Sequence, residues 1–150
     1  MSSSQEQAIR QAVEEARSCF NRGTTIPIAG RQKNLIALLR EIEKSQTEIY
    51  RALKHDLNKS RAEAYMSEIS LVKAEIKHLR RRLPRLALPR PKLPALSQLP
   101  GWLQVQREPY GVVLVMSPWN YPFQLTMEPI AAAIAGGNTV VVKPSAYTPH

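Results

Sequence analysis

The sequence predicts an α/β fold in which a helical N-terminal part precedes the beginning of a parallel sheet. Two observations predict it. Between residues 5 and 83, apolar residues recur at helical spacing, and after residue 110 two valine-rich runs flank an alanine-rich segment. With 150 residues, of which 43% are hydrophobic, the chain is long enough to bury one globular core.

The first two predicted helices cover residues 5–22 and 30–44, where Ile9 and Val13, and then Leu35 and Leu39, lie on one face. The single cysteine, Cys19, lies near the end of the first helix. Neither a base nor a helix N-terminus is in view to activate its thiol, so we interpret Cys19 as structural. One cysteine also excludes an internal disulfide, and no metal site is predicted.

Two further helices are predicted to begin at capping boxes, Ser45-Gln-Thr-Glu48 and Ser60-Arg-Ala-Glu63. In such a box the serine hydroxyl accepts from the amide three residues on, and the glutamate accepts from the serine amide. The second helix carries an apolar seam that is too short for a coiled coil, and we expect it to pack against a neighbouring domain. The seam consists of Tyr65, Ile69, Val72, Ile76, Leu79 and Leu83. Pro84 is expected to end this helix.

Residues 84–108 are predicted to form a proline-rich linker and a bridging or edge strand, the strand at Trp102–Arg107. The formal net charge is +9, and seven lysines and arginines gather between Lys77 and Lys92 without an acidic residue. A nucleic acid or another anionic surface would explain this patch, as would a solvated helix end followed by a linker. The patch has no interleaved aromatic residues on which bases could stack, so we expect no nucleic-acid partner.

A strand–helix–strand unit is predicted from residue 111 to residue 143. Gly111–Met116 and Thr139–Lys143 are apolar on both faces, as buried parallel strands are, and residues 122–135 form a helix that Gly136 and Gly137 close. Such units are the repeating piece of doubly wound, Rossmann-like nucleotide-binding sheets. Two buried parallel strands make no stable sheet alone, so we expect the chain to be the front of a longer protein.

Two polar residues are expected where these strands end, which is where open parallel sheets bind ligands. Lys143 closes the second strand and could bind phosphate or ribose, or simply be solvated. Asn120 follows the first strand in Ser117-Pro-Trp-Asn-Tyr-Pro122, whose prolines restrict the backbone on both sides of it. Its side chain offers two uncharged donors, which suit an oxygen that becomes negative during attack on a carbonyl. The alternative is that Asn120 caps the next helix.

The stretch GVVLVMSPWNYPFQLTMEPIAAAIAGGNTVVVKPS resembles the first strand–helix–strand of the aldehyde dehydrogenase superfamily. WNYPF and the preceding ALKHDLNKSRAEAYMSEI resemble its class 3 branch, which acts on fatty and aromatic aldehydes. The resemblance extends over nearly the whole chain and implies an NAD(P)-dependent parent enzyme that oxidises an aldehyde to a carboxylic acid through a cysteine thiohemiacetal. It also implies that the catalytic domain, with the nucleophilic cysteine and the catalytic glutamate, lies beyond residue 150. The 150-residue chain alone is then inactive.

The same resemblance implies a role for individual residues at the strand ends. Asn120 would donate to the oxyanion of the thiohemiacetal, and Tyr121 would line the aldehyde tunnel. Lys143 would contact the adenosine ribose of NAD or NADP, and the cofactor groove would also include Met116, Ser117, Trp119 and Ser145. The family commonly has a glutamate where this chain has Ala146. Without that carboxylate, which disfavours the 2′-phosphate, we expect the parent enzyme to accept NADP at least as well as NAD.

The predicted organisation is a helical segment of the cofactor-binding domain over residues 1–83, the linker and edge strand over 84–108, and the first strand–helix–strand over 109–150. Two other functions stay open: a truncated fragment that binds a nucleotide or a partner without catalysis, and a basic nucleic-acid-binding module. The resemblance implies a homodimer for the full-length protein. No signal peptide or membrane span is evident, which favours the cytoplasm. A C-terminal membrane tail, which some class 3 relatives carry, would lie outside this portion.

Overall fold

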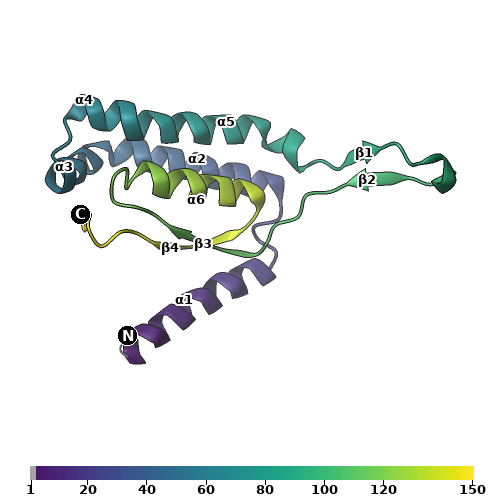
Figure 1. The fold of residues 1–150 in the computed structure, drawn as a ribbon, viewed down its shortest axis with the longest axis horizontal. Coiled ribbons are helices and arrows are strands. Elements are labelled where there is room, and N and C mark those ends of the chain that lie inside the picture. The colour runs from purple at the N-terminus through teal and green to yellow at the C-terminus, as the bar shows by residue number, and fades with distance from the viewer. Residues whose placement is uncertain (1–2) are drawn as a thin grey trace.

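The computed structural model describes residues 3–150 as layered helices around a two-stranded parallel sheet, with a hairpin extending from them (Figure 1). In the sheet, β3 (Val112–Met116) pairs with β4 (Thr139–Lys143), from Val112 opposite Thr139 to Met116 opposite Lys143. The connecting helix α6 (Gln124–Gly136) packs against both strands. The predicted strand–helix–strand unit and the α/β fold class are confirmed.

Helices cover both faces of this sheet. α1 (Ser3–Asn21) lies against one face and α6 against the other (Figure 1). α2 (Ile28–Lys44) and the long helix that ends at Ala87 pack against α6. The strands are nevertheless less buried than their composition predicts, since Leu114 and Met116 are 59% and 69% exposed. A sheet of only two strands leaves one edge of each strand and part of each face uncovered.

The two predicted capping boxes have different outcomes. At Ser60 the box is present: the Glu63 amide donates to the Ser60 hydroxyl at 3.2 Å, and the Ser60 amide donates to a Glu63 carboxylate oxygen at 3.4 Å. At Ser45 the predicted helix start is confirmed, because Ser45 is the N-cap of α3 (Gln46–Leu57) and alone separates it from α2, but the predicted box is absent. The Glu48 amide instead donates to the main-chain carbonyl of Ser45 at 3.0 Å, and the Ser45 side chain caps nothing.

The long helix consists of α4 (Arg61–Ala64), a π-helical turn η1 (Tyr65–Ile69) and α5 (Ser70–Ala87). Its apolar seam packs on α2 and α6 of the same chain, which corrects the expectation of a neighbouring domain. The shared core contains Leu35, Ile42, Ile69, Val72, Ile76, Leu83, Ala131 and Ala135. Tyr65, predicted in the seam, is 42% exposed, whereas Glu68 is fully buried. The π turn explains the change, because an extra residue in a turn rotates the residues before it relative to those after it.

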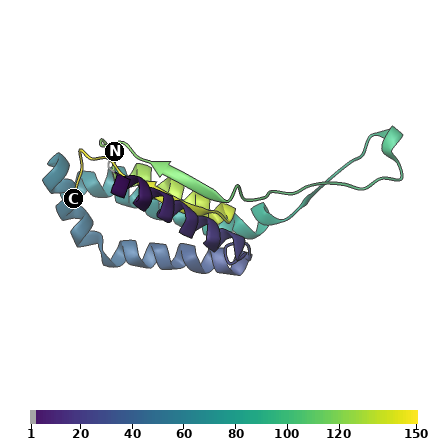
Figure 2. The same ribbon diagram turned by 90° about the horizontal axis from the view of Figure 1, so that it is seen from below.

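Pro84 does not end the long helix, which continues to Ala87. A proline inside a helix leaves the carbonyl four residues earlier without its donor, and here Gln32 Nε2 lies 3.5 Å from that oxygen, the carbonyl of Arg80. The stretch predicted as a linker with an edge strand at residues 102–107 is a β-hairpin. It pairs β1 (Arg90–Lys92) with β2 (Leu103–Val105) in antiparallel register around a short 3₁₀ turn, η2 (Leu96–Gln98). Figures 1 and 2 show this exposed arm extending away from the helices.

The C-terminus of α6 is fixed by a glycine and an arginine. Gly137 closes the helix with a φ of 86°, in the left-handed region. The Arg31 guanidinium donates to the carbonyls of Ala135 and Thr25 at 3.3 and 3.0 Å, and a Cβ at residue 137 would lie 2.7 Å from the Arg31 Cζ. The left-handed backbone favours glycine here, and a larger residue would also displace the Arg31 guanidinium from these carbonyls. Within residues 3–150, none of the helices has the length and apolar character needed to span a membrane.

Candidate functional site

The ends of the two parallel strands meet at one edge of the sheet. Met116 is paired with Lys143 there, and the Ser117 amide donates to the Lys143 carbonyl at 3.4 Å. The Lys143 side chain is exposed, and its ammonium lies 3.3 Å from the carbonyl of Pro144. Ser145 is half-buried, and its hydroxyl accepts from the Tyr147 amide at 3.2 Å. The structure therefore brings Met116, Ser117 and Lys143 together, with Ser145 two residues further along the chain.

Asn120 lies in the segment that joins β3 to α6, and its side chain is exposed. No residue between 3 and 150 forms a hydrogen bond with its carboxamide, so both amide donors are available. The residue at the N-cap of α6 is Phe123, three positions further on. The alternative in which Asn120 caps this helix is therefore wrong. Its neighbours Trp119 and Tyr121 are also exposed, at 55% and 40%.

Glu68, which is not among the site residues predicted from the sequence, caps α6 instead. One carboxylate oxygen accepts from the amides of Phe123 and Gln124 at 2.9 and 3.1 Å. The first amides of a helix have no partner within the helix, and a carboxylate satisfies them and is favoured by the helix dipole. A sequence signal for Glu68 does exist, because it lies four residues before Val72 and eight before Ile76, on the buried stripe of the helix.

Lys59 binds the other oxygen of Glu68 and also contacts the Asn120 segment. Its ammonium lies 2.5 Å from Glu68 Oε1 and donates to the Asn120 main-chain carbonyl at 3.1 Å. The same ammonium lies 4.2 Å from the centre of the Tyr121 ring, in a cation–π contact. The side chains of Lys59 and Glu68 are 8% and 0% exposed. The two buried charges therefore neutralise each other.

A pair of hydroxyls also connects the end of β3 to α6. The Thr126 hydroxyl donates to the Pro122 carbonyl at 2.5 Å. The hydroxyl oxygens of Thr126 and Ser117 lie 2.6 Å apart. The Ser117 hydroxyl is therefore engaged with α6. The segment between β3 and α6 is thus held at Ser117, at Asn120 and at the amides of Phe123 and Gln124, where the helix begins.

Comparison with known proteins identifies the family. The model of the family described as "Aldehyde dehydrogenase family" matches residues 1–150. The chain belongs to the aldehyde dehydrogenase family.

The individual relatives agree with the predicted class 3 resemblance. The chain is 40% identical over 139 residues to "Aldehyde dehydrogenase, dimeric NADP-preferring" of Canis lupus familiaris, covering 91% of this chain and 30% of that protein. It is 40% identical over 137 residues to "Aldehyde dehydrogenase family 3 member A2" of Mus musculus, covering 91% and 28%. A structure of Staphylococcus aureus AldH in its substrate-bound state is similar with a TM-score of 0.92 and 38% identity, covering 94% of this chain and 31% of that one. The chain therefore spans about 30% of the length of these dehydrogenases.

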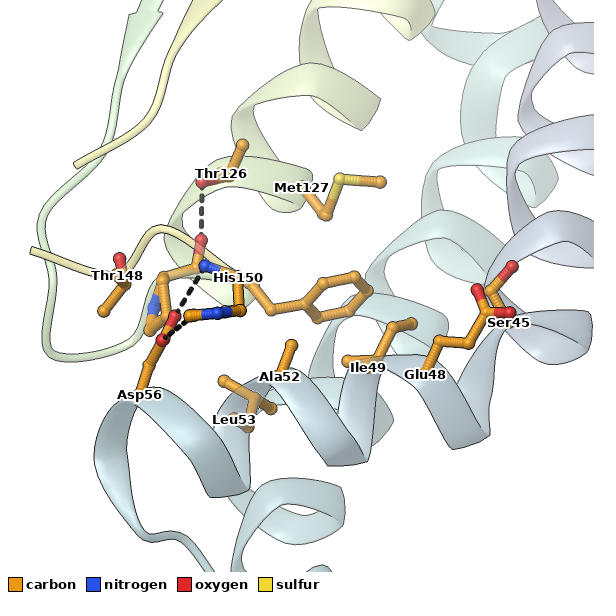
Figure 3. A pocket seen from close by; sticks show the side chains of 12 residues that line it. Ser45, Glu48, Ile49, Ala52, Leu53, Asp56, Thr126, Met127, Thr148 and His150 are labelled. Atoms are coloured by element: carbon orange, nitrogen blue, oxygen red, sulfur yellow. Dashed lines mark hydrogen bonds and ion pairs between the residues drawn. The ribbon is translucent and has the colours of Figure 1, made fainter. Parts of the chain in front are cut away.

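A separate cavity of about 320 Å³ lies between α3, the start of α6 and the C-terminal segment of this family member (Figure 3). Its wall is mostly apolar and includes Ile49, Ala52, Leu53, Phe123 and Met127. At one end, His150 donates its amide to Asp56 Oδ2 at 3.1 Å, and its ring nitrogen Nδ1 lies 2.8 Å from Oδ1. None of the site residues predicted from the sequence lines this cavity.

Asp56, His55 and His150 form a cluster that could hold a metal ion, because one ligand atom of each lies within 4.8 Å of the others. Hydrogen bonds already account for their proximity. Burial raises the pKa of Asp56, but the hydrogen bonds from His150 and His55 outweigh burial, so the pKa lies below its usual value. We interpret the cluster as an anchor that attaches the segment after β4 to α3.

Proposed function

We propose that the chain forms the N-terminal part of an NAD(P)-dependent aldehyde dehydrogenase, which oxidises an aldehyde to a carboxylic acid through a cysteine thiohemiacetal. The observation that carries the proposal is the exposed Asn120 carboxamide, which no residue between 3 and 150 engages, although buried groups hold the backbone around it. Donors that are fixed and still available are suited to stabilise an oxygen that becomes negative. The nucleophilic cysteine and the general base belong to the parent protein outside this chain.

In this proposal Asn120 donates to the aldehyde oxygen as the cysteine sulfur attacks the carbonyl carbon. A carboxamide does not titrate, so its donors stay available over the whole pH range of the reaction. It also binds an oxyanion more strongly than a neutral carbonyl, and this difference is what lowers the barrier. Tyr121, exposed beside Asn120, lines the path of the aldehyde.

The edge where β3 and β4 end suits a dinucleotide. Lys143 provides an exposed cation for the adenosine ribose, and Met116 and Trp119 provide exposed apolar surface beside it. Ser145 and Ser117 complete the proposed cofactor groove, with the Ser117 hydroxyl engaged by Thr126. When bound, NAD(P) accepts the hydride that leaves the substrate carbon.

The deciding experiment measures aldehyde-dependent formation of NADH or NADPH by the full-length protein, with fatty and aromatic aldehydes as substrates. We expect turnover by the full-length protein and none by the 150-residue chain. Turnover by the 150-residue chain would refute the assignment of the nucleophile to another part of the parent. Cofactor binding by the full-length protein without turnover of any aldehyde would instead favour a binding protein without catalysis.

We expect the full-length protein to bind NADP at least as tightly as NAD, because Ala146 places no carboxylate beside the 2′-phosphate. The dog relative, whose name describes it as NADP-preferring, supports this. The Ala146→Glu variant should weaken NADP binding about tenfold, which corresponds to about 1.4 kcal/mol of repulsion, and should change the Kd of NAD less. Much tighter binding of NAD than of NADP by the unaltered full-length protein would contradict the proposal.

We also propose that the full-length protein is a cytoplasmic homodimer that does not bind nucleic acid. The dog relative is described as dimeric. The basic residues near the end of α5 suit the negative end of the helix dipole, and this explains them without a nucleic acid. Salt-dependent binding of DNA by the full-length protein would contradict this part of the proposal.

A further inference from the structure

We propose that Lys59 and Glu68 are positioning residues, which hold the Asn120 backbone so that its carboxamide is in place when the substrate oxygen becomes negative. This inference rests on the proposed function and adds to it two residues from outside the strand–helix–strand unit. It is carried by the contacts of one buried ion pair with both ends of the segment from Asn120 to Gln124.

Glu68 fixes the C-terminal end of this segment. Its carboxylate is fully buried, with one oxygen bound by Lys59 and the other by the Phe123 and Gln124 amides. A carboxylate with three donors cannot turn away without leaving a buried charge unpaired. The first turn of α6 is therefore held against the long helix, whose π turn carries Glu68.

Lys59 fixes the N-terminal end of the segment. Its ammonium has three donors, and it contacts the Glu68 carboxylate, the Asn120 carbonyl and the Tyr121 ring. The carbonyl carbon of Asn120 is bonded directly to the Cα that carries the carboxamide. A hydrogen bond to that carbonyl therefore restricts where the carboxamide can lie, although it leaves the carboxamide's own donors available.

The arrangement also explains why the carboxamide of Asn120 is available to donate to a substrate. An asparagine just before a helix would ordinarily satisfy the first amides of that helix with its side chain. Here Glu68 satisfies two of them from another helix, so the Asn120 side chain is not needed as a cap. Structural capping and donation to substrate are divided between two residues.

The kinetic test uses a double-mutant cycle in the full-length enzyme. Lys59→Met and Glu68→Gln, each alone, should lower kcat/KM for the aldehyde about tenfold at saturating cofactor, with less than a twofold change in the KM of the cofactor. In an Asn120→Ala background, each substitution should change kcat/KM less than twofold, because the group that it positions is gone. Equal losses in both backgrounds, or no loss in either, would overturn the inference.

A second measurement does not depend on turnover, so it separates a failure of this inference from a failure of the proposed function. Hydrogen exchange of the full-length protein should become at least tenfold faster at the Phe123 and Gln124 amides in Glu68→Gln. Glu75→Gln serves as the control, because Glu75 lies on α5 of the same long helix and forms no hydrogen bond with residues 120–124 in the described structure. Unchanged exchange in Glu68→Gln would overturn the inference, whether or not the protein turns over an aldehyde.

The Lys59→Met/Glu68→Gln double variant tests whether the effects of the single variants come only from unfolding. It removes both charges together and leaves side chains of similar size, so neither partner stays as an unpaired buried charge. We expect this variant to unfold cooperatively, to exchange faster at Phe123 and Gln124, and to lose kcat/KM as the single variants do. A folded double variant with unaltered exchange and kinetics would show that the pair has no positioning role.

Discussion

The two strand ends at the edge of the sheet are held very differently. After β3, the chain is fixed at Ser117 by a hydroxyl pair, at Asn120 by Lys59, and at Phe123 by Glu68. After β4, by contrast, Lys143, Ala146 and Tyr147 are exposed. The chain there becomes buried again only at Thr148, and His150 then binds Asp56. One strand end is held by buried charges, and the other by an anchor several residues further on.

This difference corresponds to the two tasks that we propose. A donor that stabilises a transition state must already be in position, because any rearrangement during the reaction adds to the barrier. A lysine that binds a cofactor can adapt its flexible side chain to the ligand, so an exposed position is sufficient. We therefore expect substitutions at the β3 end to affect the chemical step, and substitutions at the β4 end to affect cofactor binding.

The largest expected effect is at Asn120. In the full-length protein, Asn120→Ala should lower kcat/KM for the aldehyde by about 10²- to 10³-fold, the usual result of removing one oxyanion donor. The Kd of the cofactor should stay within about twofold. Steady-state kinetics at saturating cofactor and a binding titration provide the two measurements.

Asn120→Asp is the matched variant, because it keeps the size of the side chain and replaces its donors with an anionic acceptor. We expect Asn120→Asp to lower kcat/KM for the aldehyde at least as much as Asn120→Ala does. If both variants lost only cofactor affinity, the proposed distinction between the two strand ends would be refuted.

The sequence predicts the strand–helix–strand unit and its two polar strand ends closely, because periodicity and glycine signals are local. It also places Asn120 and Lys143 at the same edge, since parallel strands end on the same side. The burial of Glu68 has a local signal in its spacing from Val72 and Ile76, but its capping role has none, because its partners Phe123 and Gln124 are 55 and 56 residues away. The π turn is missed for a related reason, because it changes the phase of an otherwise regular helical pattern.

An intermediate effect is expected at Lys143. Lys143→Met should raise the KM of the cofactor about tenfold, as expected for the loss of one hydrogen bond from a charged group, worth about 1.5 kcal/mol. The kcat at saturating cofactor should change less than twofold, because Asn120, the proposed oxyanion donor, is unaffected. Lys77→Met, an exposed lysine on α5, is the matched control and should change neither parameter. A fall in kcat with an unaltered cofactor KM would place Lys143 in the chemical step and contradict the comparison.

The smallest effect is expected at the anchor of the β4 end, in the Asp56→Asn variant. Because the pKa of Asp56 in the folded protein lies below its ordinary value of 3.8, its ionised form stabilises the fold above that pH. This contribution is lost as the pH falls through the folded pKa. The free energy of unfolding of the variant should therefore be lower than that of the unaltered protein near pH 6, and the difference should shrink below pH 4.

Denaturant unfolding of the full-length protein at a series of pH values measures this difference. Hydrogen exchange should become faster over residues 144–150 of the variant and stay unchanged at Phe123 and Gln124, which Glu68 holds independently. A stability difference that is equally large at pH 3 would show that Asp56 does not act through its charge. Faster exchange at both strand ends would show that the two ends are coupled, and the chemical and binding roles could then not be separated by position.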